Sequence, residues 1–541
     1  MTTAERRLVP GEAGAGGYRP LTAEPGERHL VRTELCSGSL ADGWRRSATP
    51  LLVLAHLSDT HVMDHQSPGR AELMDRYSDP DSPVRPAAGL IGTYRAQELF
   101  TFQVAEAMVL AVRASPRAPV SAAPLDFAVV TGDATDNCQL NELRGYLRLL
   151  DGGEVVPDSG DPQRYEGVSA PGVDDERYWH PEGGPPDLPR TRYGFPAAPG
   201  VLDAARRPFL ATGLGLPWYA VHGNHDNLLQ GTVVPQGWLQ RFPVGGVKLV
   251  TPPSDLDAGA LLARFESGDA DALADLARSA QLTVTPDPGR ATVTRADHIR
   301  QHFRSTGTPA GHGYTERNLA GGTAYYAFDH GLIRCVVLDT VNEHGGWQGS
   351  LDETQLRWLE GELATNAARP AVLFSHHPLE TLVNDTRPPG AGRRVLAAEL
   401  RDRLLAHPCV VAWLNGHTHV HAVTAVTGPD GTGFWQITTA SHIDWPQQAR
   451  IVEFLASRQG LVIGCTVIDS AAPASYRDAS SAADRTDPVG LAALARELAA
   501  NDWQLRDLIT ADGGAGAGLV PDRNVLLPLD WPRATGQRRL T

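Results

Sequence analysis

Cysteine is scarce in this chain, and the few cysteines present are spread far apart. The 541 residues contain five cysteines, an odd total with no Cys-x-x-Cys pair. A disulfide framework or a thiolate-ligated zinc site is therefore not expected, and reduced thiols in a cytosolic protein are the simplest interpretation. The five residues are Cys36, Cys138, Cys335, Cys409 and Cys465.

Long apolar runs are also missing. No stretch approaches the roughly 18 apolar residues that a transmembrane helix needs. Residues 1–33 hold charged and glycine-rich patches but lack the apolar core of a signal peptide. We therefore expect a cytoplasmic protein with no membrane partner.

Positive charge is the third shortage. Lys and Arg number 48 against 63 Asp and Glu, so the formal net charge is -15. Nonspecific binding to a phosphate backbone needs clustered Lys and Arg, so no nucleic-acid partner is expected. The hydrophobic fraction of 42% and the charged fraction of 21% are typical of a soluble globular protein.

What the chain does contain is a repeated arrangement of short apolar runs that end in residues able to bind metals. Such runs predict buried β-strands, and open α/β sheets bind ligands just outside the carboxyl ends of their strands. Each of these short polar stretches, here called packets, could by itself be a turn or a helix cap; Asp136, for example, could cap the helix 139–150. It is improbable that all of the packets have this explanation. The packets are Asp59-Thr60-His61, Gly132-Asp133, Gly223-Asn224-His225-Asp226, His376-His377-Pro378 and Gly416-His417-Thr418-His419.

Apolar spacing and composition also predict how the chain is organised. We expect an irregular N-terminal arm over 1–48, a main domain over 49–470, and a C-terminal tail over 471–541 with one helix packing on that domain. Two segments, about 151–216 and 227–322, are too long for plain connections and are expected to be insertions, the first an irregular segment or lid over a site. Helices are expected at 94–113, 139–150, 258–279, 353–364, 393–406 and 488–508.

In this order the five packets resemble the calcineurin-like metallophosphoesterase superfamily, whose pattern is matched from Asp59 to His419. The resemblance implies an α/β fold, a four-layer α/β/β/α sandwich of two mixed β-sheets flanked by helices, with long loop insertions. It also implies a dinuclear metal centre, in which His376 is selected because the family's ligand stands two residues before the proline. One ion would be held by Asp59, His61 and His419, the other by Asn224, His376 and His417, with Asp133 bridging both.

The donor types agree with such a centre. Carboxylate, imidazole and amide oxygen without thiolate suit Mn, Fe or Zn, and the sequence does not choose among these ions. Two such ions can share a hydroxide and stabilise both the attacking and leaving oxygens at phosphorus. His225 lies outside the metal ligands and is expected to donate a proton to the leaving group, with Asp226 orienting its ring. His377 is expected to support the ligands without binding a metal.

These expectations predict a metal-dependent phosphoric ester hydrolase that attacks with a metal-bridging hydroxide. The long insertions would narrow a cleft over the metals, which favours a small phosphodiester or phosphomonoester as substrate. A nuclease of the same superfamily is one alternative, and the acidic balance weighs against it. A non-catalytic metal-binding or interaction module on the same fold is the other, although every ligand position is filled here.

Overall fold

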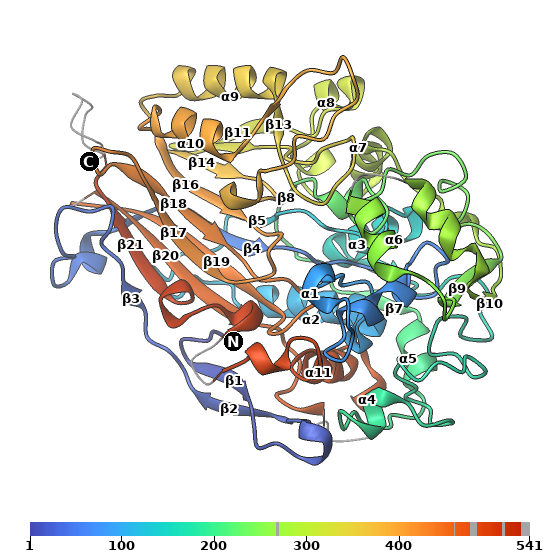
Figure 1. Ribbon diagram of the computed structural model, residues 1–541. Helices are drawn as coiled ribbons and strands as arrows, with labels where there is room; N and C mark the ends of the chain where they lie inside the picture. The colour runs from blue at the N-terminus through green and yellow to red at the C-terminus, as the bar shows by residue number, and fades with distance from the viewer. Residues whose placement is uncertain (267–269, 459, 477–483, 511–513, 532–541) are drawn as a thin grey trace.

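The structure is a computed structural model that describes residues 1–266, 270–458, 460–476, 484–510 and 514–531. Its centre is a pair of β-sheets (Figure 1). The larger sheet has seven strands in the order β3-β21-β20-β19-β4-β5-β8, and β4, β5 and β8 run parallel to one another. These strands are β3 (Leu30–Val31), β4 (Thr49–Leu57), β5 (Phe127–Val130), β8 (Trp218–Ala220), β19 (Gln448–Ser457), β20 (Gly460–Asp469) and β21 (Val525–Leu529).

The second sheet has six strands in the order β11-β12-β14-β16-β18-β17. Its four inner strands are parallel, and the antiparallel strands β11 and β17 form its two edges. The inner strands β14 and β16 are buried along their whole length, as their continuous apolar sequences require. The six strands are β11 (Tyr326–His330), β12 (Ile333–Val337), β14 (Ala371–Phe374), β16 (Val410–Asn415), β17 (Ala422–Thr427) and β18 (Gly433–Thr438).

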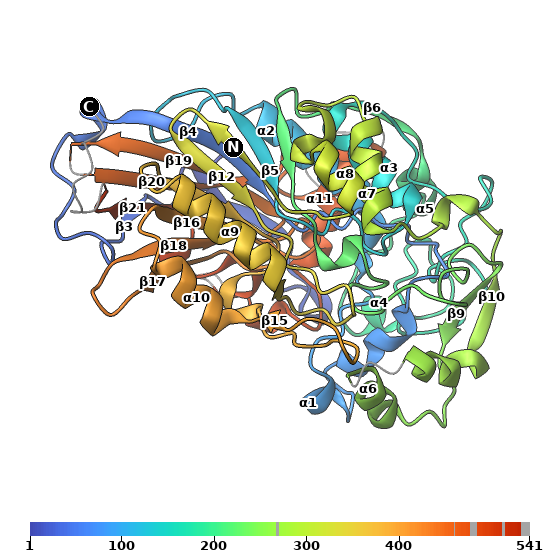
Figure 2. The same ribbon diagram turned by 90° about the horizontal axis from the view of Figure 1, so that it is seen from above.

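Helices cover the outer faces of both sheets. Helices α9 (Glu353–Thr365) and α10 (Ala397–Leu405) lie over the six-stranded sheet (Figure 2). Helices α2 (Thr101–Arg113) and α3 (Leu140–Asp151) pack on the seven-stranded sheet, and one continuous hydrophobic core joins all four layers. The predicted α/β/β/α sandwich of two mixed sheets is therefore confirmed.

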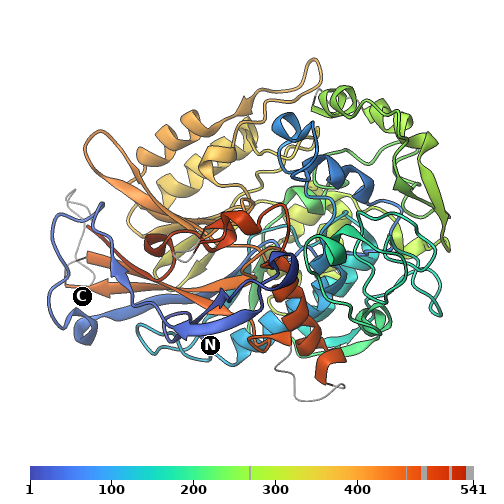
Figure 3. The same ribbon diagram turned by 60° about the horizontal axis from the view of Figure 1, so that its bottom comes forward.

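The arm and the tail are more ordered than the sequence predicts. The arm forms a hairpin of β1 (Arg6–Pro10) and β2 (Leu21–Pro25), and its strand β3 pairs with β21 of the tail inside the main sheet. The tail helix α11 (Pro488–Ala499) packs against α2 (Figure 3). Tyr18 of the arm donates a hydrogen bond to Glu497 (3.0 Å). Both ends of the chain thus contribute to the same sheet.

The two insertions also contain regular structure. Segment 151–216 holds the hairpin of β6 (Gly153–Val155) and β7 (Phe209–Ala211) and two short helices, α4 (Leu188–Thr191) and α5 (Val201–Arg206). Its aromatic residues share a buried cluster with α11, so this insertion is packed against the body. The helix expected at 258–279 is present as α6 (Ala258–Glu266) and the 3-10 segment Ala270–Arg278, and residues 267–269 lie outside the described residues.

No described helix has the length and hydropathy needed to cross a membrane.

Candidate metal centre

The carboxyl ends of five strands converge at one place between the two sheets. Strands β4, β5 and β8 end just before the packets at Asp59, Asp133 and Asn224. Strands β14 and β16 of the other sheet end at the packets of His376 and His417. Because neighbouring parallel strands present their carboxyl ends at the same edge, residues far apart in sequence meet there.

One predicted ligand group consists of Asp59, His61 and His419, whose donor atoms all lie within 4.8 Å of one another. The two imidazoles face each other, with Nε2 of His61 3.2 Å from Nε2 of His419. Oδ1 of Asp59 lies 3.5 Å from the same nitrogen of His419. The structure therefore brings together the three residues expected at the first ion.

The second predicted group is centred on His376 and His417, with Nε2 of His376 3.2 Å from Nδ1 of His417. Oδ2 of Asp133 lies 3.1 Å from Nε2 of His376 and 3.7 Å from Nε2 of His61, and so stands between the two groups. Asn224 is fixed by a hydrogen bond from its Nδ2 to the Gly231 carbonyl (3.0 Å), which leaves its buried Oδ1 without a hydrogen-bond partner among the described residues.

The hydrogen bonds of the first group fix which nitrogens are free. Nδ1 of His61 lies 3.2 Å from the carboxylate of Asp136, and Nδ1 of His419 lies 2.7 Å from that of Asp444. An ionised carboxylate only accepts, so both Nδ1 atoms carry hydrogen and the two Nε2 atoms are the nitrogens left to bind a proton or a metal ion. Two such nitrogens 3.2 Å apart repel each other unless a proton or a metal ion binds to them. This is how metal-binding histidines are held by carboxylates behind them.

The second group follows the same rule. Nδ1 of His376 donates to the Thr131 carbonyl (2.8 Å), so its Nε2 is the nitrogen left to face Asp133 and His417. His377 differs, because its Nε2 donates to the Trp347 carbonyl (3.0 Å) and its Nδ1 accepts from the Thr340 hydroxyl (2.8 Å). With both nitrogens engaged, His377 supports the site, as predicted, and is not a free ligand.

The charges of the site favour a bound cation. Burial acts to lower the pKa of His376, but the charges of Asp133 and Asp59 raise it to about 9. Burial acts in the same direction on His419, yet its hydrogen bonds to Asp444 and Asp59 raise its pKa to about 10. In the absence of metal, protons occupy the positions where the carboxylates attract positive charge.

Backbone strain is concentrated in the same residues. Five of the seven predicted ligands have positive φ, between 41° and 68°. Non-glycine residues in this region cost about 1–3 kcal/mol each, and such strain persists where the surrounding structure enforces it. Gly416 is required nearby, because a Cβ at this position would collide with the Ser58 hydroxyl and the Asp59 carboxylate. The five residues are Asp59, His61, Asp133, His417 and His419.

The prediction that Asp226 orients the His225 ring is wrong. Nδ1 of His225 donates to the backbone carbonyl of Asp136 (2.7 Å), while Asp226 accepts from the Gly223 amide (2.9 Å) and the Thr135 amide (3.0 Å). The turn Asn224–Asp226 is a single 3-10 turn that directs the Asp226 carboxylate back toward its own start, away from the His225 ring.

Asp136 also differs from its expected role as a helix cap. Helix α3 is capped by Gln139 together with Glu142, which leaves the Asp136 side chain free for the site. Its carboxylate contacts His61, and Arg70 donates to it from behind (3.3 Å). Burial acts to raise the pKa of Asp136, but the hydrogen bond to His61 and the charge of Arg70 hold it well below its usual value. Asp136 therefore stays ionised and orients both His61 and His225.

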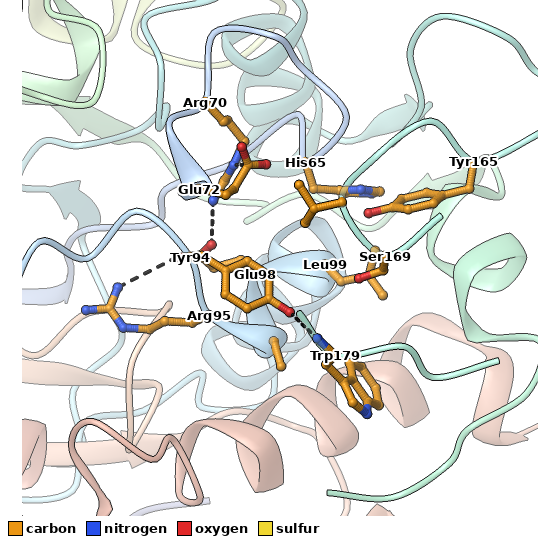
Figure 4. Close-up of a pocket in the computed structure, with 12 residues that line it drawn as sticks. His65, Arg70, Glu72, Tyr94, Arg95, Glu98, Leu99, Tyr165, Ser169 and Trp179 are labelled. Atoms are coloured by element: carbon orange, nitrogen blue, oxygen red, sulfur yellow. Dashed lines mark hydrogen bonds and ion pairs between the residues drawn. The ribbon is translucent and has the colours of Figure 1, made fainter. Parts of the chain in front are cut away.

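A layer of buried charges behind the ligands was not predicted. Arg95 lies 3.1 Å from Asp444, which in turn holds His419. Arg70 and Arg95 both approach Glu98, beside a cavity of about 20 Å³ (Figure 4). The two arginines thus neutralise the carboxylates that orient the two facing imidazoles.

Replacing Asp444 by alanine is expected to weaken metal binding by about 10- to 100-fold, the usual contribution of a partner that orients a metal-binding histidine. Titration of metal-free protein with Mn or Zn would measure the dissociation constant. Asp385→Ala provides a control at an exposed carboxylate whose ion-pair partner is Arg387. An unchanged constant for Asp444→Ala would show that His419 does not depend on this contact.

Access to the centre is narrow. Three of its imidazoles are partly exposed: His417, His225 with 20% and His419 with 24% of the side chain exposed. Trp347 is 53% exposed and stacks on His417, with ring centroids 5.8 Å apart. The reacting group of a substrate therefore has to enter beside His225 and His419, with an aromatic surface nearby.

Comparison with known proteins adds little to this geometry. No protein-family model matches the chain, and no curated protein matches it. Among solved structures, a dimetal phosphatase from Danio rerio is 13% identical, with a TM-score of 0.34 over 78% of this chain and 97% of that chain. At this TM-score the similarity adds nothing to the architecture of two facing mixed sheets with flanking helices. The His and Asp groups at their strand ends form candidate metal sites.

Proposed function

We propose that this protein is a dinuclear metal-dependent phosphoesterase. The observation that carries the proposal is the pair of facing imidazole contacts, each 3.2 Å between nitrogens, with the Asp133 carboxylate between them. Such donors suit Mn, Fe or Zn. Two ions of this kind, when bound, activate water and neutralise charge that develops at phosphorus.

The residues around the ligands suit a hydrolase. His225 is held by Asp136 and lies edge-on to His61, with ring centroids 4.6 Å apart. Gly231 has no side chain, and this leaves room for the Nε2 edge of the His225 ring. We assign His225 the delivery of a proton to the leaving oxygen, since it is the partly exposed imidazole that is not a predicted ligand.

A small phosphodiester or phosphomonoester is the proposed substrate. The restricted opening beside His225 and His419 supports a compact substrate. A nuclease would need a basic track for a phosphate backbone, and the net charge of -15 opposes one.

Metal analysis combined with phosphoester assays tests the function. The purified protein is expected to bind two transition-metal ions at this centre and to hydrolyse p-nitrophenyl phosphate or bis-p-nitrophenyl phosphate. Chelation should abolish the activity, and Mn, Fe or Zn should restore it, because the activated water depends on the ions. Two bound ions without turnover of any phosphoester would instead favour a non-catalytic metal-binding module.

A further inference from the structure

A second cluster of possible ligands lies behind the Asn224–Asp226 turn. It consists of His222, Asp226 and His298, all buried, with donor atoms within 4.8 Å of one another. His222 follows β8, and His298 lies on α7 (Arg295–Arg304) in the second insertion. The rings of His222 and His298 meet edge to face, with centroids 4.8 Å apart. The cluster therefore joins the insertion to the turn that carries Asn224 and His225.

Three of the four imidazole nitrogens in this cluster lack hydrogen-bond partners among the described residues. Neither Nδ1 nor Nε2 of His222 has one among the described residues, and the same is true of Nδ1 of His298. Both rings are at most 1% exposed, so bulk water does not reach them. Burial holds the pKa of His298 well below its usual value, which leaves a neutral ring with a free lone pair. Buried polar atoms without partners are costly and call for a ligand.

The carboxylate of Asp226 is fully buried and has no cationic partner among the described residues. It accepts three hydrogen bonds, from the Gly223 amide and from the amide and hydroxyl of Thr135. Within the described parts of the chain, no Lys, Arg or His nitrogen lies within ion-pair distance of it. Carboxylates that bind metals are usually fixed by such hydrogen bonds. Burial and the nearby charge of Asp133 raise the pKa of Asp226 to about 7, and a cation beside the carboxylate would stabilise its ionised form.

We infer that His222, Asp226 and His298 bind a third metal ion, of the Zn²⁺ type, separate from the dinuclear centre. Two imidazole nitrogens and one carboxylate oxygen are ligands that zinc accepts, and a bound water would complete a tetrahedral site. The ion would link α7 to the Asn224–Asp226 turn and thereby hold Asn224 and His225 in place. This role is structural, so the inference does not require that the protein hydrolyse phosphoesters.

The test counts zinc in full-length, zinc-loaded protein by mass spectrometry. Wild type is expected to bind three ions and His298→Gln two, with a lower melting temperature that added zinc no longer raises. His298→Cys is expected to regain the third ion, because a thiolate is also a zinc ligand. Equal zinc content in wild type and His298→Gln would overturn the inference.

His312→Asn provides the matched control. His312 is buried and stacks on Trp218 nearby, but its Nε2 already bonds to the Ser305 hydroxyl (2.6 Å). Asparagine tolerates the positive φ of 48° at this position. This variant should keep all three ions, and loss of one ion from it as well would contradict a specific role for His298.

A second measurement tests the third site in the Asp133→Asn variant, so that the result does not depend only on whether His298→Gln folds. The Asp133→Asn variant, which is expected to lose the dinuclear ions, should retain one zinc ion that Asp133→Asn/His298→Gln lacks. If Asp133→Asn retains no zinc, the third site is absent. If wild type binds one ion and His298→Gln binds none, the result supports the site at His298 and contradicts the proposed dinuclear centre.

Discussion

Replacing Asp133 by asparagine is expected to remove both ions of the dinuclear centre and to lower phosphoester hydrolysis by at least about a thousandfold. Oδ2 of Asp133 stands between the two ligand groups, 3.1 Å from His376 and 3.7 Å from His61. An amide has no negative charge and only one oxygen with which to bridge them. Metal ions contribute several kcal/mol to catalysis of this type, and each 1.36 kcal/mol is a factor of ten in rate.

The substitution should leave the fold intact. Asparagine tolerates the φ of 48° at position 133. Its side-chain oxygen can accept the hydrogen bond that the His225 backbone amide donates to Oδ1 of Asp133 in the wild type (2.9 Å). Metal content and kcat/KM would be measured together, with circular dichroism to confirm folding. Asp469→Asn is the control, since Asp469 is equally buried but bonds to Gln448 at the end of β20. Full occupancy of both ions and a normal rate in Asp133→Asn would rule out a bridging role.

The candidate ligand residues could be proposed from the sequence because each packet is local. An apolar strand, a turn and the candidate ligands follow one another within a short stretch, so a strand end such as Leu57 could be placed from apolar patterning. The two-sheet architecture followed from resemblance in those same packets and is confirmed.

The groups behind the ligands could not be predicted in the same way. Asp444 reaches His419 from 25 residues further along the chain, and no pattern around Asp444 indicates that contact. Asp136 follows the packet Gly132-Asp133, and the sequence allowed it to be a helix cap. In the structure Gln139 and Glu142 form that cap instead. The position of a side chain behind a metal ligand depends on tertiary packing, which local sequence does not encode.

The strands that the two ends of the chain add to the main sheet were not predicted, for a related reason. Strand β3 has only two residues, Leu30 and Val31, both exposed, so it lacks the apolar run that indicates a buried strand. Its partner β21 contains Pro528, which usually argues against a sheet position. The pairing of β3 with β21 joins residues almost 500 positions apart, and only the folded chain brings them together.

Replacing His225 by alanine is expected to keep both ions and to lower kcat by about 10²- to 10⁴-fold, the usual contribution of general acid–base catalysis. His225 is not among the predicted ligands, and its ring is held by the backbone carbonyl of Asp136 rather than by a metal-facing group. Esters with poor leaving groups need the proton most. The loss should therefore be large for an alkyl phosphoester and small for one that releases p-nitrophenolate.

Rates would be measured on a series of phosphoesters whose leaving groups differ in pKa, at full metal occupancy. His407→Ala serves as the control, because His407 lies just before β16, at the opposite end of that strand from the metal centre. An equal loss across the series would contradict proton donation and would leave His225 with a part in binding the substrate. A loss of metal in His225→Ala would instead make it a ligand, and the turn at Asn224 would then contribute two donors to the centre.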